Sequence, residues 1–136
     1  MIGRIYRHSI IVLTIVAAVS LFITLQAAIA QGQNEPKSNV VNSKYLTIKD
    51  QKFRHESFSD SITGTVVNNS TSGVSSAEVF AALYDKDNHL ITVQSGFADV
   101  MNLKPAEDSA FKISLFGLGS ETIDHYTLLG GGTASP

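Results

Sequence analysis

The stretch Ala77-Glu78-Val79-Phe80-Ala81-Ala82-Leu83-Tyr84-Asp85 decides the fold of this 136-residue chain. In an extended segment successive side chains point to opposite faces, and here both alternating sets are apolar. One set comprises Val79, Ala81 and Leu83, and the other comprises Phe80, Ala82 and Tyr84. A strand that is apolar on both faces is typical of the middle of a sheet that is covered on each side. We therefore expect Ala77–Asp85 to be a central, doubly covered strand.

Short segments with strand composition lie on both sides of this stretch, and turn residues separate them. Lys86-Asp87-Asn88 has the composition of a tight turn, so Leu90–Phe97 is the expected hairpin partner of the central strand. The other expected strands are Tyr45–Ile48, Ser57–Asn68, Phe111–Leu115 and Thr122–Leu129. No window after residue 44 has the period of a long helix. Six or seven short strands in about 100 residues predict an all-β fold, an antiparallel β-sandwich over residues 45–129.

The first 30 residues have a different composition. Arg4 and Arg7 precede the apolar run Ile10–Leu25, and small residues follow up to Ala28-Ile29-Ala30. This order is typical of a secretory signal peptide that is cut after Ala30. Without the cut, the 22 residues from Ser9 to Ala30 are long enough for one N-terminal apolar helix that anchors the chain in a membrane. Both alternatives make the rest of the chain extracytoplasmic, either secreted or anchored to the cytoplasmic membrane.

Polar segments flank the predicted sandwich. Residues 31–44 contain Pro36 and three asparagines without any periodicity, so we expect a flexible polar tether. Residues 130–136 begin with three glycines and are expected to form a disordered tail. The chain is thus predicted to consist of a signal peptide or membrane anchor (1–30), a tether (31–44), the sandwich (45–129) and the tail (130–136).

Composition and charge exclude several classes of protein. The chain has no cysteine, which removes disulfide scaffolds, cysteine nucleophiles and the metal sites that thiolates build. Its net charge is −2, and after residue 56 three lysines face nine acidic side chains. That balance argues against nucleic acid as a partner and against docking on an anionic lipid surface.

The sequence carries no constellation typical of an enzyme. There is no G-x-S-x-G elbow, and the adjacent carboxylates of Glu107 and Asp108 point apart in an extended chain. Gly130-Gly131-Gly132 follows an expected strand but precedes no helix, unlike a phosphate-binding loop. We therefore expect a protein without enzymatic activity and without a cofactor.

Asp85, Asp87 and His89 are the candidate metal ligands, because two carboxylates and an imidazole fall within five residues. Calcium needs six to eight oxygen ligands, and Phe97 stands where a calcium loop has its last glutamate. A hairpin turn rich in Asp and Asn explains the same residues. The histidines after the leader lack the spacing of paired metal ligands; they are His55, His89 and His125.

Asn68 and Asn69 are candidate glycosylation sites. They begin two overlapping acceptor sequences, Asn68-Asn69-Ser70 and Asn69-Ser70-Thr71, in a segment with loop composition. A loop of an exported domain is where such acceptors are modified in hosts that have the glycosylation machinery.

Phe80-Ala81-Ala82-Leu83-Tyr84-Asp85 resembles the signature of the FxLYD domain, an Ig-like β-sandwich of exported and membrane-anchored bacterial and archaeal proteins. Three further segments resemble that family in order. They are Gly64-Thr65-Val66-Val67-Asn68-Asn69, Leu103-Lys104-Pro105 followed by Phe111-Lys112-Ile113, and Ile123-Asp124-His125-Tyr126-Thr127-Leu128. The chain departs from the pattern at two positions. Its phenylalanine comes one residue early, with Ala81 at the usual aromatic position, and Ala106 stands where a glycine is usual.

The resemblance covers roughly Tyr45 to Leu129 and implies an Ig-like sandwich in the cell envelope, without a catalytic site. It marks a set of structural residues: Phe80, Leu83, Tyr84, Asp85, Phe111 and Tyr126. From their chemistry, we expect Leu83 to fill the core, Tyr84 to bury its ring, and the carboxylate of Asp85 to accept turn amides.

Together these observations favour a non-enzymatic binding or structural module of the cell envelope. Its expected partner is another envelope protein or a glycan, and the membrane itself through Ile10–Leu25 if the leader is retained. Two alternatives stay open: a small accessory subunit of a membrane complex, held by the N-terminal helix, and a weak metal- or solute-binding protein that uses Asp85, Asp87 and His89.

Overall fold

A computed structural model of the chain describes residues 35–134. The signal peptide or membrane anchor predicted over residues 1–30, including Ile10–Leu25, lies outside the described residues. The same holds for residues 31–34 of the predicted tether and for residues 135–136 of the predicted tail. Within the described range, no helix is long and apolar enough to cross a membrane.

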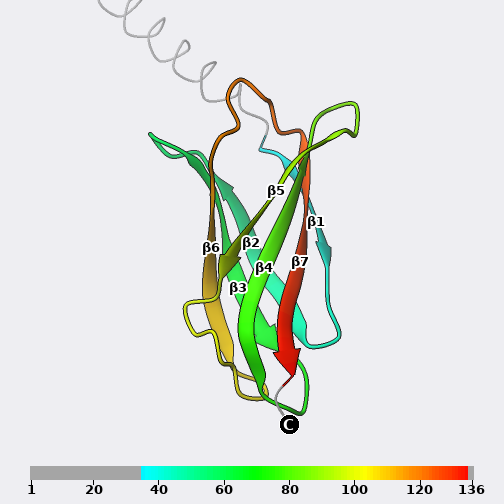
Figure 1. Cartoon of the computed structure of the whole chain (residues 1–136), viewed down its shortest axis with the longest axis vertical. Helices are drawn as coiled ribbons and strands as arrows, with labels where there is room; N and C mark the ends of the chain where they lie inside the picture. Colours follow the sequence, from blue (N-terminus) through cyan, green and yellow to red (C-terminus); the bar gives the residue numbers. More distant parts are fainter. Residues whose placement is uncertain (1–34, 135–136) are drawn as a thin grey trace, which may run out of the picture. The chain divides into compact units, whose positions relative to one another are not determined.

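The described residues form seven strands in two sheets, which lie against each other as two layers (Figure 1). The strands are β1 (Lys37–Val41), β2 (Leu46–Arg54), β3 (Asp60–Asn68), β4 (Val74–Tyr84), β5 (Leu90–Phe97), β6 (Asp108–Leu115) and β7 (His125–Ala134). One sheet has the order β1-β7-β4-β5 and the other has the order β2-β3-β6. The predicted all-β fold with two sheets is confirmed.

The stretch Ala77–Asp85 lies where the sequence predicts, in the middle of the four-stranded sheet. β4 pairs antiparallel with β5 on one side and with β7 on the other. Val79, Ala81 and Leu83 on its inner face are completely buried. They belong to one core with Ile62 of β3 and Phe111 of β6, in the opposite sheet. Alternation along the strands therefore directs one face of each sheet into a shared apolar interior.

The expectation that β4 is covered on both faces is wrong. Its second set of side chains points away from the core, and Phe80 in the middle of this set is 36% exposed. The three-stranded sheet packs against the inner face, and no element within residues 35–134 packs on the outer one. A two-layer molecule of seven strands supplies one cover for each sheet, so the outer side of β4 meets solvent.

The segment predicted as a tether contains a strand. β1 pairs with β7 in parallel, in register from Lys37 opposite His125 to Val41 opposite Leu129. The sandwich is thus not wholly antiparallel, and it begins eight residues earlier than the sequence predicts. The strand escapes pattern analysis because it lies at the edge of the sheet, where four of its five side chains are exposed and apolar periodicity is not required.

The three glycines predicted to open a disordered tail continue β7 as far as Ala134, paired with the first half of β4. Glycine is needed here because neighbouring side chains fill the space of a side chain on β7. A Cβ atom at Gly131 would lie 2.8 Å from the ring of Phe80, and one at Gly132 would lie 2.6 Å from Val74. The run of glycines is therefore a strand under close approach rather than a free end.

Several strand ends also differ from the prediction. β4 begins at Val74 and β6 at Asp108, earlier than expected, and β7 begins at His125, later than expected. β3 begins at Asp60 instead of Ser57, and Phe58, expected on that strand, lies in the preceding turn with its side chain fully in solvent. β2 runs on past Ile48 to Arg54 through an irregularity between Lys49 and Lys52. Asp50 in this bulge has a φ of 53°, which breaks the alternation that marks a strand in the sequence.

Ala106, which stands where the FxLYD pattern usually has a glycine, lies in the turn between Leu103 and Glu107. Ala106 has a φ of 65°, in the left-handed region that glycine adopts without steric cost. Its backbone N–H donates to the carbonyl of Asn68 at 2.9 Å, which fixes this conformation, and its side chain is exposed. Alanine therefore occupies a glycine-type position here without a packing contact in return.

We predict that Ala106→Gly stabilises the domain, by about 0.5–1 kcal/mol, because it relieves left-handed strain at an exposed position. Chemical denaturation measures this as a higher midpoint at unchanged slope. Ala110→Gly in β6 is the matched control, since Ala110 is exposed and in a strand; it should lower stability by a similar amount. Destabilisation by Ala106→Gly would contradict the assignment of strain to this turn.

Candidate functional site

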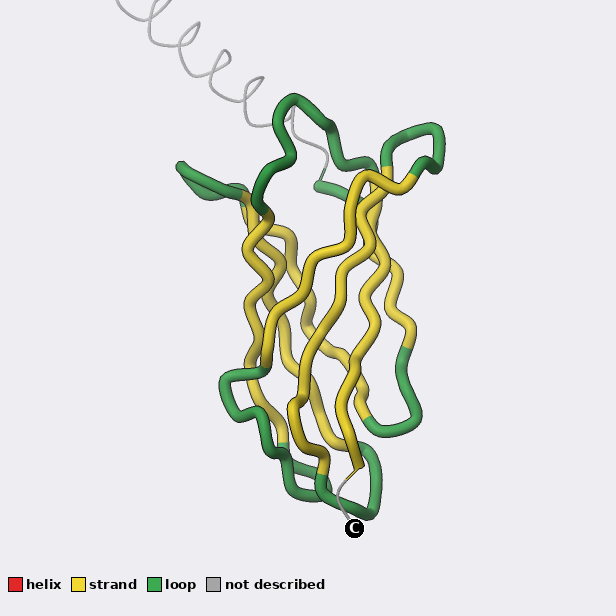
Figure 2. The backbone as a smooth tube through the Cα atoms, viewed as in Figure 1, coloured by secondary structure: helices red, strands yellow, loops and turns green. Residues whose placement is uncertain are grey.

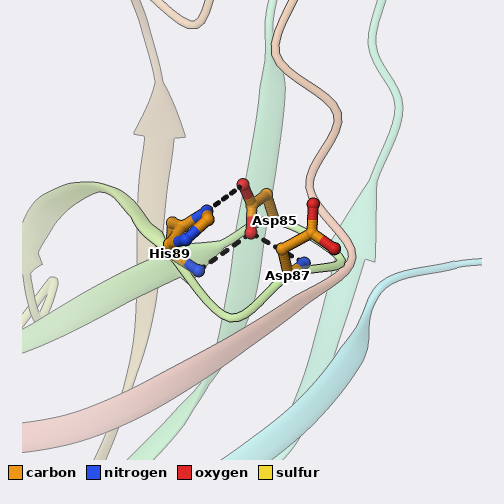
Figure 3. A group of neighbouring side chains, drawn as sticks. All are labelled: Asp85, Asp87 and His89. Carbon is orange, nitrogen blue, oxygen red and sulfur yellow. Dashed lines mark hydrogen bonds and ion pairs between the residues drawn. The ribbon is translucent and has the colours of Figure 1, made fainter.

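The turn between β4 and β5 is built around the carboxylate of Asp85 (Figure 3). Its Oδ1 accepts hydrogen bonds from the backbone N–H groups of Asp87, at 2.9 Å, and His89, at 2.8 Å. Its Oδ2 lies 3.1 Å from Nδ1 of His89. The backbone of Asp85 also bonds to Asn88 and His89 across the turn. The expectation that Asp85 accepts turn amides is what the geometry shows.

The other polar groups of this turn have partners of their own. The carboxylate of Asp87 lies 2.7 Å from Nζ of Lys86. The amide oxygen of Asn88 lies 3.0 Å from Nε2 of His125, on β7. The ring of His125 is stacked on that of Tyr84, with centroids 5.1 Å apart and an interplanar angle of 8°. These contacts fasten the turn to the neighbouring strand.

Asp85, Asp87 and His89 do come together, because each offers a ligand atom within 4.8 Å of the others. Figure 3 shows His89 on one side of Asp85 and Asp87 on the other. The hydrogen bond from the His89 backbone, followed by the bonds from the His89 ring and the Asp87 backbone, holds the pKa of Asp85 below its ordinary value. A cation would have to displace these bonds, and three ligands fall short of the six to eight that calcium takes. The arrangement fits a hairpin turn better than a metal centre.

A shallow hollow of about 500 Å³ lies beside this turn. Asp85 and His89 line one part of it, and Phe116, Leu118 and Glu121 of the loop between β6 and β7 line another. Figure 2 shows these two loops at the same end of the sheets. The hollow contains one imidazole and two carboxylates, but the imidazole of His89 contacts the carboxylate of Asp85, which caps the turn, and no hydroxyl nucleophile.

The histidines occupy separate contacts. His55 lies 3.1 Å from Oδ1 of Asp60 and packs edge-on against Phe53. His125 lies 3.0 Å from Oδ2 of Asp124. Each of the three histidines in the described residues therefore has its own aspartate, and only His89 belongs to the group around Asp85.

The two candidate glycosylation asparagines have opposite environments. Asn68 is completely buried, and its Nδ2 donates to the carbonyls of Ser72, at 2.8 Å, and Leu103, at 3.0 Å. Its Oδ1 accepts from the N–H and the hydroxyl of Ser70. Asn69 is exposed, with one side-chain bond to Thr47. In the folded domain Asn68 is thus a structural clasp between two loops, and only Asn69 offers an accessible amide.

The residues marked as structural by the family resemblance divide into inner and outer groups. Leu83, Phe111 and Tyr126 are buried in the core. Burial raises the pKa of Tyr126, against the opposing effect of a side-chain hydrogen bond with Ser38 of β1. Tyr84 is half-buried on the outer side, and Phe80 beside it on the same face is exposed. Phe80 therefore does not belong to the core.

Phe80 belongs to a larger exposed feature that the sequence analysis missed. Six of the ten large apolar side chains exposed within residues 35–134 lie on the outer side of the four-stranded sheet, according to its register. We call this set the outer apolar face: Val41, Phe80, Leu90, Val93, Phe97 and Leu129. Val41, Leu129 and Phe80 are direct neighbours on β1, β7 and β4. The sequence signal for this face is the second apolar set of Ala77–Asp85, which fits an exposed apolar surface as well as a covering layer.

The outer side of the three-stranded sheet has a different character. Register places four basic side chains on it, Lys49, Lys52, Arg54 and Lys112, together with threonines. Lys112 and Glu56 form an ion pair at 2.9 Å, and the hydrogen bond from Lys112 lowers the pKa of Glu56. One sheet thus presents an apolar surface and the other a charged one, so the two sides of the sandwich suit different environments.

No protein-family model matches the chain, and comparison with curated proteins gives no similar protein. The candidate site is therefore defined by the geometry of the described residues.

We predict that Asp85→Asn lowers the thermal midpoint of the domain near neutral pH, because it removes the charge that the turn amides solvate. The pKa of Asp85 in the fold lies below its ordinary value of 3.8. Its contribution is therefore complete above about pH 3.8 and is lost as the pH falls through the folded pKa. The two proteins should converge once the pH lies below the folded pKa of Asp85. Asp87→Asn is the control, and an Asp85→Asn difference that does not change with pH would contradict this origin.

We predict that Asn68→Asp destabilises the domain by about 2–4 kcal/mol, because it places a carboxylate opposite two carbonyls that now accept hydrogen bonds. Asn69→Asp is the matched control at the next position and should change stability by less than about 0.5 kcal/mol. Denaturant unfolding of the three proteins measures both values. Equal losses at the two positions would show that Asn68 is not the clasp.

Proposed function

We propose that this chain is a non-enzymatic binding module of the cell envelope, an exported or membrane-anchored Ig-like β-sandwich that contacts its partner through the outer apolar face. The observation that carries this proposal is the concentration of exposed apolar side chains on one side of one sheet. Soluble monomers rarely expose a contiguous apolar patch of more than a few hundred Å². Leaving six such side chains in water is costly unless a partner removes them from it.

The chemistry of the face favours binding over catalysis. Its middle rows combine aliphatic and aromatic side chains with small polar ones such as Thr127 and Ser95, and the charged side chains Lys37 and Glu78 lie in the end rows. Depletion of charge with enrichment of aromatic residues is the composition of the centre of a protein interface. Exposed rings such as those of Phe80 and Phe97 can also stack on the apolar side of a sugar, so a glycan partner is compatible with the same surface.

The resemblance to the FxLYD domain gives independent support. In that family's pattern the phenylalanine falls at the position of Ala81, which here is completely buried on the inner face of β4. Moving the ring by one residue transfers it to the opposite face, because side chains alternate along a strand. Phe80 therefore adds nothing to the core and contributes its ring to the outer surface, as expected for a residue whose role is contact.

The two alternatives make different demands on the molecule. An accessory subunit held by an N-terminal helix would use the same face, but it would keep Ile10–Leu25 in the membrane. The intact mass of the protein, measured separately in membrane and soluble fractions, distinguishes a retained helix from a released domain. A weak metal- or solute-binding protein would use Asp85, Asp87 and His89. We do not favour it, because the carboxylate of Asp85 already accepts three hydrogen bonds within the turn.

The proposed function is tested by photo-crosslinking the full chain in its host. A benzophenone amino acid in place of Val93, which is 54% exposed on the outer apolar face, should yield a covalent adduct of defined mass. The same group in place of Thr65, on the outer side of the three-stranded sheet, is the matched control and should yield little. Absence of an adduct at Val93, or equal adducts at both positions, would overturn the proposal.

A further inference from the structure

We propose that the partner on the outer apolar face is a second copy of this chain, in a two-fold dimer in which the four-stranded sheets pack face to face. This inference rests on the proposed function, since it names the occupant of the same face. It is carried by the size of the face, by the placement of its two charged side chains, and by the state of the sheet edges.

The size of the face lies near the lower limit of what a specific dimer requires. The six apolar side chains are each about one third to one half exposed. Since large apolar side chains present about 150–250 Å² each, together they expose on the order of 500 Å². The polar members of the same rows, such as Asn39 and Ser95, extend the surface toward the roughly 800 Å² that each partner contributes to a standard interface. Two copies would therefore bury on the order of 1,000 Å² of apolar surface, and the polar members of the rows would add to it.

The charges of the face complement each other in a dimer. Register places Lys37 in the row of His125 and Tyr84 at one end of the face, and Glu78 in the row of Gly131 and Phe97 at the other end. A two-fold axis that runs roughly across the strands reverses the order of the rows. The end with Lys37 of one copy then meets the end with Glu78 of the other, and the symmetry repeats this pair. Of the two rows between these ends, the one with Leu129 and Phe80 then meets the one with Ala82 and Val93 of the other copy.

The edges of the sheets favour the face over strand addition. β5 and β6 are linked across the two sheets by a bridge between Ala98 and Phe111, and Gln94 exchanges hydrogen bonds with the backbone of Phe116. The β2 edge carries the bulge around Asp50. These features disfavour regular pairing with another strand at those three edges. The edge of β1 stays open, but β1 has only five residues, so the outer apolar face offers the larger contact.

Sedimentation of the purified full chain in mild detergent, over a range from about 1 to 200 µM, tests the inference. We expect a reversible monomer–dimer equilibrium. Val93→Glu should weaken dimerisation at least tenfold, because it buries an unpaired carboxylate within the contact. Phe58→Glu is the matched control, since Phe58 is fully exposed in the turn between β2 and β3 of the other sheet, and it should leave the equilibrium unchanged. A monomer at every concentration, or a dimer insensitive to Val93→Glu, would overturn the inference.

Charge exchange tests the orientation of the two copies. Lys37→Glu and Glu78→Lys should each weaken the dimer about tenfold, because each places like charges opposite one another twice. The double variant Lys37→Glu/Glu78→Lys should recover the original affinity to within about threefold. Weak association of the double variant would contradict a two-fold axis that runs across the strands.

The crosslink at Val93 separates this inference from the function on which it rests. An adduct with twice the mass of the chain supports both. An adduct of any other mass supports a binding function through the outer apolar face and overturns the second copy as occupant. Absence of an adduct overturns both.

Discussion

The packing of a four-stranded sheet on a three-stranded one removes the inner face of each sheet from water and leaves each outer face exposed. The core that results is continuous, with fully buried side chains such as Leu83 and Ile113 meeting between the layers. With only two layers, the chain has no further element within residues 35–134 to place over β4. The exposure of the apolar outer side of β4 is thus a direct consequence of the way in which the core is built.

The features that hold the loops in place leave this outer side undisturbed. Asn68 clasps the loops next to β3 from inside the molecule, and Asp85 closes the β4–β5 turn with its own carboxylate. Gly131 leaves room for the ring of Phe80, because a Cβ atom there would lie 2.8 Å from that ring. The outer apolar face is carried by paired strands instead of loops, which lowers the entropic cost of binding to it.

The sequence predicts the all-β class and the central place of β4 because strong alternation at Val79, Ala81 and Leu83 reports burial directly. It does not predict β1, because an exposed edge strand needs only backbone hydrogen bonds. It also does not predict the end of β7, because the need for glycine there comes from side chains that are distant in sequence. The clasp at Asn68 shows the same limit: an acceptor sequence and a buried amide look alike until the carbonyls of Ser72 and Leu103 are located. Apolar residues on both sides of a strand likewise indicate burial without saying whether the cover comes from the same chain.

Hydroxyl-radical footprinting of the full chain at low and high concentration tests most directly that the outer side of β4 is covered by a second copy. We predict that Phe80, Phe97 and Leu129 lose reactivity as concentration rises, because a second copy removes them from water. Phe58, which is fully exposed in the turn between β2 and β3, should keep its reactivity. Unchanged reactivity on the outer apolar face, or equal loss at Phe58, would contradict a second copy as the cover of this side of the sheet.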